Sequence, residues 1–185
     1  MTATRNELEA RYSILFELLD AERNGELTAQ DMTALATRVV TAFEATATPA
    51  KTAAVYTAFA AYWEGLAAHL GGGDGPFNRT QFIKALQVAI GDSEAGFTQL
   101  IRPIADTLFG LIDTDDNGEM SLAEFRQAQV AMGVDSVDSE RAFARIDADG
   151  NGRIDREELV AAVADFYRNP SSDSPMSEFF GALSR

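Results

Sequence analysis

The chain has 185 residues, a formal net charge of −14 and no cysteine. The acidic charge argues against nucleic acids and anionic membranes as partners, and the lack of cysteine excludes disulfides, thiolate zinc sites and cysteine nucleophiles. No apolar stretch is long enough to cross a membrane, and the first residues lack the profile of a secretion signal. We therefore expect a soluble, cytoplasmic protein whose charge suits cations as ligands.

Apolar residues recur every three or four positions from Glu7 to Leu19, which predicts an amphipathic helix. This helix leads into the first loop, defined as Asp20 to Asp31, which has oxygen-bearing side chains at positions 1, 3, 5 and 12, glycine at position 6 and an apolar residue at position 8. The candidate metal ligands are the side chains of Asp20, Glu22, Asn24 and Asp31 and the carbonyl group of Glu26.

Two positions of the first loop depart from the usual calcium-binding pattern. Glu22 at position 3 is one methylene longer than aspartate, and Asp31 at position 12 is one methylene shorter than glutamate. A shorter closing side chain makes bidentate coordination harder, and it moves selectivity toward Mg²⁺, which prefers fewer ligands at shorter distances. The first loop therefore either binds a metal ion, with Mg²⁺ in competition, or keeps only the shape of a metal site.

A second loop follows two further helical patterns, Met32 to Phe43 and Ala53 to Leu70, which are separated by a break at Pro49. This second loop, defined as Leu70 to Gln81, keeps a glycine at position 6 and Phe77 at position 8. It lacks an oxygen-bearing side chain at position 1, and position 12 is a neutral amide. Such a loop cannot bind calcium, so we expect a degenerate repeat that packs against the first loop.

The third loop, defined as Asp113 to Glu124, has the complete pattern of an EF-hand calcium loop. Its candidate ligands are the side chains of Asp113, Asp115, Asn117 and Glu124 and the carbonyl group of Glu119. Gly118 allows the sharp turn, and Glu124 is expected to supply two oxygens. The preceding helix should have Ser93 as its N-cap, and Pro103 should either bend it or stand in the first turn of a shorter helix.

The fourth loop, defined as Asp147 to Glu158, repeats every element of the third. Its candidate ligands are the side chains of Asp147, Asp149, Asn151 and Glu158 and the carbonyl group of Arg153. Because a single helix-loop-helix unit leaves an apolar face exposed, the third and fourth units should pair, with Met120 opposite Ile154. We predict an all-α fold of four EF-hand motifs in two pairs, residues 1–90 and residues 91–185.

A short tail follows Pro170, where the last long helix should stop. It carries Met176, Phe179, Phe180 and Leu183 on one helical side. This tail is either a plug for an apolar cleft or an exposed adhesive end. The plug is favoured, because exposed phenylalanine pairs promote aggregation.

The loops together resemble the sarcoplasmic calcium-binding proteins and their bacterial relative calerythrin over nearly the whole chain. The resemblance rests on Asp31 as the last residue of the first loop, the long gap before the second loop, and the two complete loops in the C-terminal half. It implies a compact molecule in which the two EF-hand pairs pack together, a calcium or magnesium buffering role, and a third metal site at the first loop.

Two functions remain open from the sequence. The first is intracellular calcium buffering or transport by a monomer without catalysis, because the acidic groups belong to the metal loops and the single histidine, His69, has no catalytic partner at ligand spacing. The alternative is a calcium sensor that exposes a hydrophobic groove and binds a target protein. The chain has five methionines, fewer than the methionine-rich surfaces of such sensors would require.

Overall fold

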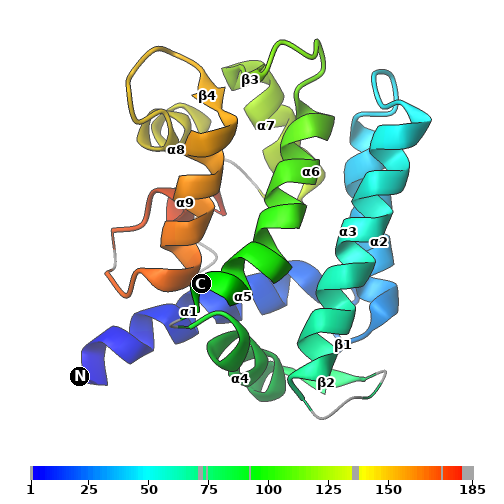
Figure 1. The fold of residues 1–185 in the computed structure, drawn as a ribbon, viewed down its shortest axis with the longest axis vertical. Helices are drawn as coiled ribbons and strands as arrows, with labels where there is room; N and C mark the ends of the chain where they lie inside the picture. The colour runs from blue at the N-terminus through cyan, green and yellow to red at the C-terminus, as the bar shows by residue number, and fades with distance from the viewer. Residues whose placement is uncertain are drawn as a thin grey trace.

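The computed structural model describes residues 2–70, 73, 75–91, 93–134, 138–171 and 173–180, with side chains from residue 7 onward. Helices make up most of this part of the chain, and the four strands have two residues each (Figure 1). The two strand pairs lie at opposite ends of the long axis, and the helices run between them. The predicted all-α fold of paired EF-hand motifs is confirmed.

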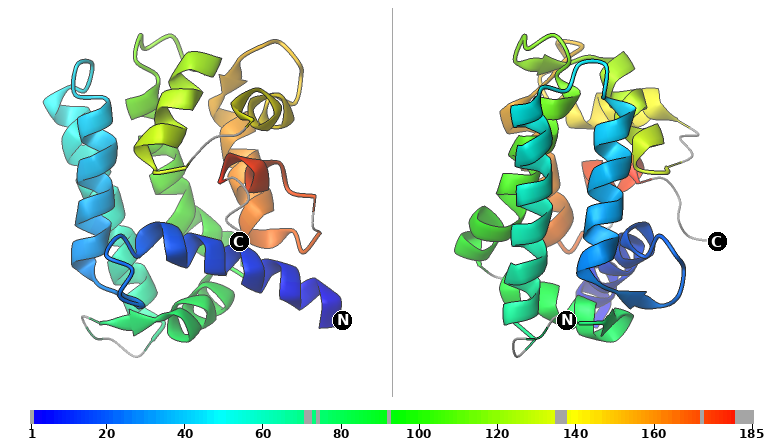
Figure 2. Two further views of the ribbon diagram at one scale, coloured as in Figure 1. Left: turned by 180° about the vertical axis from the view of Figure 1, so that it is seen from behind. Right: turned by 90° about the vertical axis from the view of Figure 1, so that its right-hand side faces the viewer.

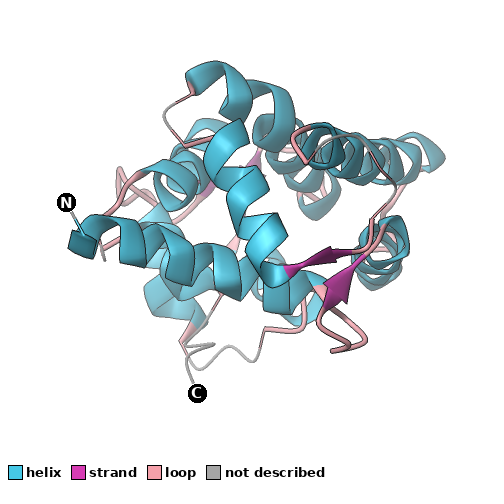
Figure 3. Cartoon of the chain, turned by 90° about the horizontal axis from the view of Figure 1, so that it is seen from below, coloured by secondary structure: helices cyan, strands magenta, loops and turns pink. Residues whose placement is uncertain are grey.

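The N-terminal half consists of two helix-loop-helix units. Its elements are α1 (Thr2–Leu19), β1 (Glu26–Leu27), α2 (Ala29–Ala42), α3 (Pro49–Ala68), β2 (Phe77–Asn78) and α4 (Arg79–Ala89). β1 and β2 pair antiparallel (Figure 3), with Leu27 opposite Phe77, and both of these side chains are buried. The second loop therefore packs against the first, as predicted. Pro49 begins α3, where its missing N–H costs no helical hydrogen bond.

The C-terminal half repeats this arrangement. Its elements are α5 (Glu94–Gly96), the π-helix η1 (Phe97–Ile101), α6 (Arg102–Ile112), β3 (Glu119–Met120), α7 (Leu122–Ala131), α8 (Ser139–Ile146), β4 (Ile154–Asp155), α9 (Arg156–Arg168) and α10 (Pro175–Phe179). β3 and β4 pair antiparallel, and Met120 lies opposite Ile154 as expected.

The helix before the third loop is divided near Pro103. Ser93 caps its start by accepting a hydrogen bond from the Gly96 backbone N–H at 3.0 Å, as predicted. The chain then forms η1, and α6 begins at Arg102, which places Pro103 in the first turn of a shorter helix. The π-turn lets the chain continue without the hydrogen bond that proline cannot donate.

One continuous apolar core joins the two halves of the molecule. It includes Tyr12 and Phe59 from the N-terminal half and Phe109 and Phe166 from the C-terminal half. α3 packs along α6, and α1 crosses beneath the C-terminal helices (Figures 1 and 2). Within the described ranges, no helix is both long and apolar enough to span a membrane.

Cationic side chains from the N-terminal half bind the C-terminal ends of helices in the other half. The donors are Arg11 on α1, Arg38 on α2 and Lys51 on α3. Their acceptors are the carbonyl oxygens of Phe166 and Asn169 at the end of α9, of Ala131 and Met132 at the end of α7, and of Asp113 at the end of α6. A helix presents unpaired carbonyl groups and partial negative charge at this end, so each contact ties the two halves together.

The C-terminal segment is a plug rather than an exposed end. α10 packs on α8 and α9 (red in Figure 2), and Met176, Phe179 and Phe180 are buried. Leu183, the fourth apolar residue of the predicted segment, lies outside the described residues.

Candidate metal centre

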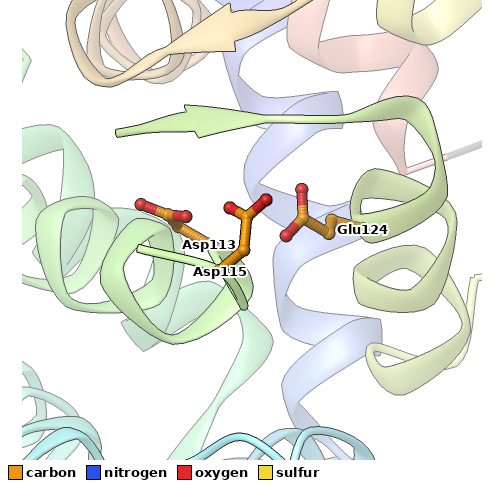
Figure 4. Close-up of side chains that lie close together, drawn as sticks. All are labelled: Asp113, Asp115 and Glu124. Carbon is orange, nitrogen blue, oxygen red and sulfur yellow. The ribbon is translucent and has the colours of Figure 1, made fainter. Parts of the chain in front are cut away.

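The third loop gathers three carboxylates at one point (Figure 4). Asp113 ends α6, Asp115 lies in the loop, and Glu124 lies in the first turn of α7. One oxygen from each lies within 4.8 Å of the others. Asp113 and Glu124 are buried, whereas Asp115 faces solvent. Such a cup of hard oxygen ligands, open on one side, suits a cation such as Ca²⁺.

Backbone N–H groups hold the third loop in this shape. The Asp113 carboxylate accepts hydrogen bonds from the N–H groups of Asn117 at 3.0 Å and Gly118 at 2.9 Å. The Asn117 side-chain oxygen accepts one from the Glu119 N–H at 2.8 Å. Gly118 has φ of +83°, a left-handed conformation that glycine adopts without a steric cost. The turn therefore directs the oxygen side chains of positions 1, 3 and 5 toward one side.

Glu124 closes the third loop from the following helix. Its Oε1 accepts hydrogen bonds from the Thr114 N–H at 2.8 Å and the Thr114 hydroxyl at 2.7 Å. Its Oε2 accepts from the Ser121 N–H at 2.8 Å and the Ser121 hydroxyl at 2.7 Å. Burial alone would raise the pKa of Glu124, but these four hydrogen bonds outweigh it and lower the pKa below its ordinary value. The residue is therefore poised as a carboxylate that joins the two ends of the loop.

The fourth loop repeats this geometry in a more exposed setting. One oxygen each from Asp147, Asp149 and Glu158 lies within 4.8 Å of the others. The Asp147 carboxylate accepts from the N–H groups of Asn151 at 3.1 Å and Gly152 at 2.9 Å, and Asn151 accepts from the Arg153 N–H at 2.7 Å. Glu158 accepts from the N–H groups of Ala148 at 2.9 Å and Asp155 at 2.9 Å, so it spans the loop as Glu124 does.

The first loop keeps the turn but differs at its closing residue. The Asp20 carboxylate accepts from the N–H groups of Asn24 at 3.0 Å and Gly25 at 2.8 Å, and Asn24 accepts from the Glu26 N–H at 2.8 Å. Among the described residues, Asp31 accepts hydrogen bonds from Thr28 alone, through the N–H at 2.8 Å and the hydroxyl at 2.7 Å.

The shorter closing side chain explains why the acidic groups of the first loop stay apart. Glu124 reaches the residue at position 2 of its loop, whereas Asp31 has no such contact with Ala21. Among the described residues, three-carboxylate clusters within 4.8 Å occur in the third and fourth loops, and Asp20, Glu22 and Asp31 do not form another. The first loop thus keeps the turn of a metal-binding loop, but its closing carboxylate does not reach position 2.

The second loop keeps the reciprocal cap at its end. The Gln81 N–H donates to the Asn78 side chain at 3.0 Å, and the Asn78 N–H donates to the Gln81 side chain at 3.0 Å. Both side chains are neutral amides. Residues 71, 72 and 74 of this loop lie outside the described part of the chain, and the expectation that it binds no calcium stays a prediction.

Comparison with known proteins places this geometry in a family. The EF hand domain model matches residues 138–166, which contain the fourth loop. Calerythrin from Saccharopolyspora erythraea is 30% identical over 154 residues, which cover 82% of this chain and 87% of calerythrin. The chain belongs to the calerythrin family of EF-hand proteins. The resemblance inferred from the loops is therefore confirmed.

Solved structures of similar fold agree with this membership. A Streptomyces coelicolor calcium-binding protein, presented as a structural basis for prokaryotic calcium-mediated regulation, has a TM-score of 0.74 and 28% identity. The match covers 86% of this chain and 97% of that protein. A sarcoplasmic calcium-binding protein from amphioxus has a TM-score of 0.72 at 14% identity, covering 94% and 96% of the two chains, and shares the fold alone.

Family membership settles the kind of protein. The chain is a calcium-binding EF-hand protein, and calerythrin, the relative that shows its family, is a calcium-binding protein rather than an enzyme. The prediction that it is not an enzyme is confirmed on that ground. The ligand assignments residue by residue, and the division into residues 1–90 and 91–185, stay predictions.

Two features of the loops escaped the sequence analysis. Position 4 has a left-handed backbone in each metal-type loop, at Arg23 with φ of +53°, Asp116 with φ of +55° and Gly150 with φ of +72°. The glycine at position 150 was the signal available for this. The second feature is Lys51, whose ammonium group lies at the rim of the third loop. Sequence spacing does not reveal this contact, because Lys51 and the third loop lie in different helix-loop-helix motifs.

Proposed function

We propose that the chain buffers or transports calcium ions, with two sites in its C-terminal half. The third site consists of Asp113, Asp115, Asn117, Glu119 and Glu124, and the fourth site consists of Asp147, Asp149, Asn151, Arg153 and Glu158. The clustering of three carboxylates in each loop carries this proposal. Glu119 and Arg153 take part through their carbonyl groups, since position 7 of such a loop contributes its backbone oxygen.

The packing of α10 and the cationic contacts between the two halves favour buffering over sensing. A sensor must expose an apolar groove when calcium binds, whereas here α10 fills the C-terminal groove with Met176, Phe179 and Phe180. Among the described residues, Val88 and Val130 are the large apolar side chains that are strongly exposed. The cationic contacts of Arg11, Arg38 and Lys51 also hold the ends of α9, α7 and α6, which a groove-opening motion would have to move.

We further propose that the first loop is a weaker, third site made of Asp20, Glu22, Asn24, Glu26 and Asp31. Its turn hydrogen bonds match those of the complete loops. Its shorter closing residue favours a smaller cation, so Mg²⁺ competes here more effectively than at the other sites. β1 pairs with β2, and β3 pairs with β4. This pairing supports the division of the chain into two EF-hand pairs, residues 1–90 and residues 91–185.

A calcium titration of metal-free protein in about millimolar Mg²⁺ tests the proposal. Trp63 reports on the N-terminal half, because it is buried and its ring centroid lies 4.8 Å from that of Phe77. A dye that binds apolar surface reports on groove opening. Buffering predicts dye fluorescence that falls or stays level while two ions bind tightly. A rise in dye fluorescence on folded protein would contradict it.

The sensor function is the second candidate, and one observation favours it. The similar Streptomyces coelicolor protein is presented in terms of calcium-mediated regulation. If this chain acts likewise, calcium must change a surface that another protein can bind. The same titration separates the two candidates, because only a sensor increases its exposed apolar surface as calcium enters.

A further inference from the structure

A pocket of about 130 Å³ lies between α2 and α3, which stand side by side at one edge of the molecule (Figures 1 and 2). On α3 the pocket is lined by Tyr56, Phe59 and Trp63, which recur three and four positions apart and therefore share one face of the helix. On α2 the lining includes Ala29 and Ala36. Because large side chains of α3 stand against small ones of α2, the space between the two helices is not filled.

The degenerate second loop supports the aromatic wall of this pocket. The ring centroid of Trp63 lies 4.8 Å from that of Phe77 in the second loop, and Trp63 is buried. At Gly75, where φ is +84°, an added Cβ would lie only 3.0 Å from Trp63 Cζ2. The absence of a side chain thus lets the loop backbone approach the indole closely. The loop that lacks the calcium pattern therefore positions Trp63.

The opening of the pocket is polar and anionic. Glu64 and Thr33 line it and are exposed, whereas Trp63 is buried, so the carboxylate stands toward solvent and the aromatic ring toward the interior. The hydroxyl groups of Tyr56 and Thr37 lie 3.0 Å apart and connect the two helices. Among the described residues, no lysine or arginine lines the pocket or forms an ion pair with Glu64. A cationic ligand would therefore meet no competing positive charge there.

Aromatic rings and one carboxylate around an apolar pocket suit an organic cation. The face of an aromatic ring attracts an ammonium group within about 6 Å of its centroid, and this is how proteins recognise quaternary ammonium groups. A metal ion needs several oxygen ligands, and this lining offers a single carboxylate. An apolar cavity of about 150 Å³ admits benzene, so a pocket of about 130 Å³ has room for a trimethylammonium group but not for a large ligand.

We infer that this pocket binds a small, free organic cation with a methylated ammonium group, such as choline. Tyr56, Phe59 and Trp63 contact the methyl groups, and Glu64 attracts the positive charge. A phosphate group beside the ammonium group would be repelled by Glu64 and by the net charge of −14, which favours a free cation over the phosphocholine head group of a lipid. This function goes beyond calcium buffering. None of the proposed metal ligands lines the pocket, so either function can fail without the other.

The first experiment adds choline to the calcium-saturated full chain and follows the emission of Trp63, the single tryptophan. Calorimetry repeats each titration, so that binding without a change in emission is still detected. A ligand of this size should bind with a dissociation constant of roughly 0.1–1 mM. The absence of saturable binding in both measurements would overturn the inference.

Two further ligands test the chemistry of recognition. The neutral isostere of choline, with carbon in place of the ammonium nitrogen, keeps the shape but loses the charge, so it should bind at least about fivefold more weakly. Equal binding would show that the pocket recognises only apolar bulk. Phosphocholine should also bind more weakly than choline. Tighter binding of phosphocholine would assign the pocket to a lipid head group. Either of these results would overturn the inference.

A matched pair of substitutions on α3 tests the location of the site. Ala60 and Ala61 are neighbours and both are exposed, but only Ala60 lines the pocket. Ala60→Leu should obstruct the pocket and weaken choline binding at least tenfold, whereas Ala61→Leu should bind choline like wild type. Both variants should bind as many calcium ions as wild type. Equal choline affinity of the two variants would place the cation elsewhere and overturn the inference.

A second pair of substitutions separates the local carboxylate from the general acidity of the chain. Glu64→Gln should weaken choline binding about threefold at low salt, and it should reduce the discrimination against phosphocholine. Glu44→Gln removes the same charge at an exposed position that does not line the pocket, and it should have no effect. Equal weakening by both variants would indicate attraction of any cation to an acidic surface and would refute a specific site.

Discussion

Lys51 Nζ lies 3.0 Å from the carbonyl oxygen of Asp113 and 2.7 Å from Asp116 Oδ1. A cation from the N-terminal half therefore stands beside the third calcium loop, which belongs to the C-terminal half. It caps the end of α6 and offsets part of the carboxylate repulsion in the metal-free loop. When Ca²⁺ enters, the same ammonium group repels it.

Lys51→Met should therefore raise the calcium affinity of the third loop. Two charges on the ion and one on Lys51, a few ångströms apart in a solvated setting, correspond to roughly a 3- to 10-fold effect at low ionic strength. The gain should shrink in high salt, because salt screens the repulsion. Calorimetric titration at two salt concentrations measures both effects. Lys84→Met, at an exposed position on α4, is the control, and a lower affinity for Lys51→Met would contradict this account.

Replacing the closing glutamates should remove tight ions one at a time. Glu124→Gln keeps the shape but loses a carboxylate that holds both ends of its loop. We expect affinity at that site to fall at least about tenfold, since hydrogen bonds and ligation by a charged group are lost together. Glu158→Gln should have the same effect on the fourth loop. Counting tightly bound ions by equilibrium dialysis checks this, and an unchanged count in both variants would refute the ligand assignment.

Lengthening the closing residue of the first loop should have the opposite effect. Asp31→Glu supplies the methylene that Asp31 lacks and allows contact with position 2, as Glu124 makes with Thr114. The variant should gain calcium affinity at the first loop and lose some preference for Mg²⁺. Competition titrations with both ions measure this. If Asp31→Glu binds the same ions with the same affinities as wild type, the first loop is only a structural scaffold.

Substitutions at two glycines distinguish the effect of backbone strain on stability from the effect of packing. An added Cβ would meet nothing within 4 Å at either Gly118 or Gly110, but only Gly118 has a left-handed backbone, with φ of +83°. Gly118→Ala should cost about 1–2 kcal/mol of unfolding free energy. Gly110→Ala, inside α6, should add roughly 0.5–1 kcal/mol. Urea unfolding of the metal-free proteins gives both values, and equal effects would show that the turn does not demand glycine.

The loops were predictable because their chemistry is local. Twelve consecutive residues determine both the turn and the ligand types, so Asp113 and Glu124 could be assigned to one site from spacing alone, and the structure does bring their carboxylates together. The opposition of Met120 and Ile154 followed from the same register. The sequence allowed two interpretations of Pro103. Proline fixes its own backbone angle φ, but it does not determine the hydrogen bonding of the residues that precede it.

The contacts between motifs were not predictable in this way. Arg38 binds the end of α7 and Lys51 the end of α6, yet no periodicity marks either residue as more than a surface cation. The sequence predicts that Asp31 reaches less far across its loop than a glutamate would. It does not predict which group Asp31 contacts instead, and among the described residues that group is Thr28. Partners far apart in sequence are determined by packing, and a single sequence does not record them.

Acid should loosen α10 through Glu178. The hydrogen bond from Arg141 lowers the pKa of Glu178 below its ordinary value of 4.5; burial opposes this shift, and the hydrogen bond from Arg145 and both positive charges add to it. Because the folded pKa is depressed, this group stabilises the fold above the ordinary pKa, and the stabilisation disappears as pH falls through the lowered value.

The measurement for this prediction compares metal-free wild type with Glu178→Gln from pH 7 to pH 3, so that loss of calcium does not contribute. Two other carboxylates act on this cluster and are present in both proteins: Asp173, which contacts Arg145, and Asp138, whose charge acts on Arg141. At pH 7 wild type should be the more stable of the two, and the difference in unfolding free energy should shrink toward zero below about pH 4.5. A difference that stays constant over this range would mean that Glu178 holds α10 by shape and not by charge.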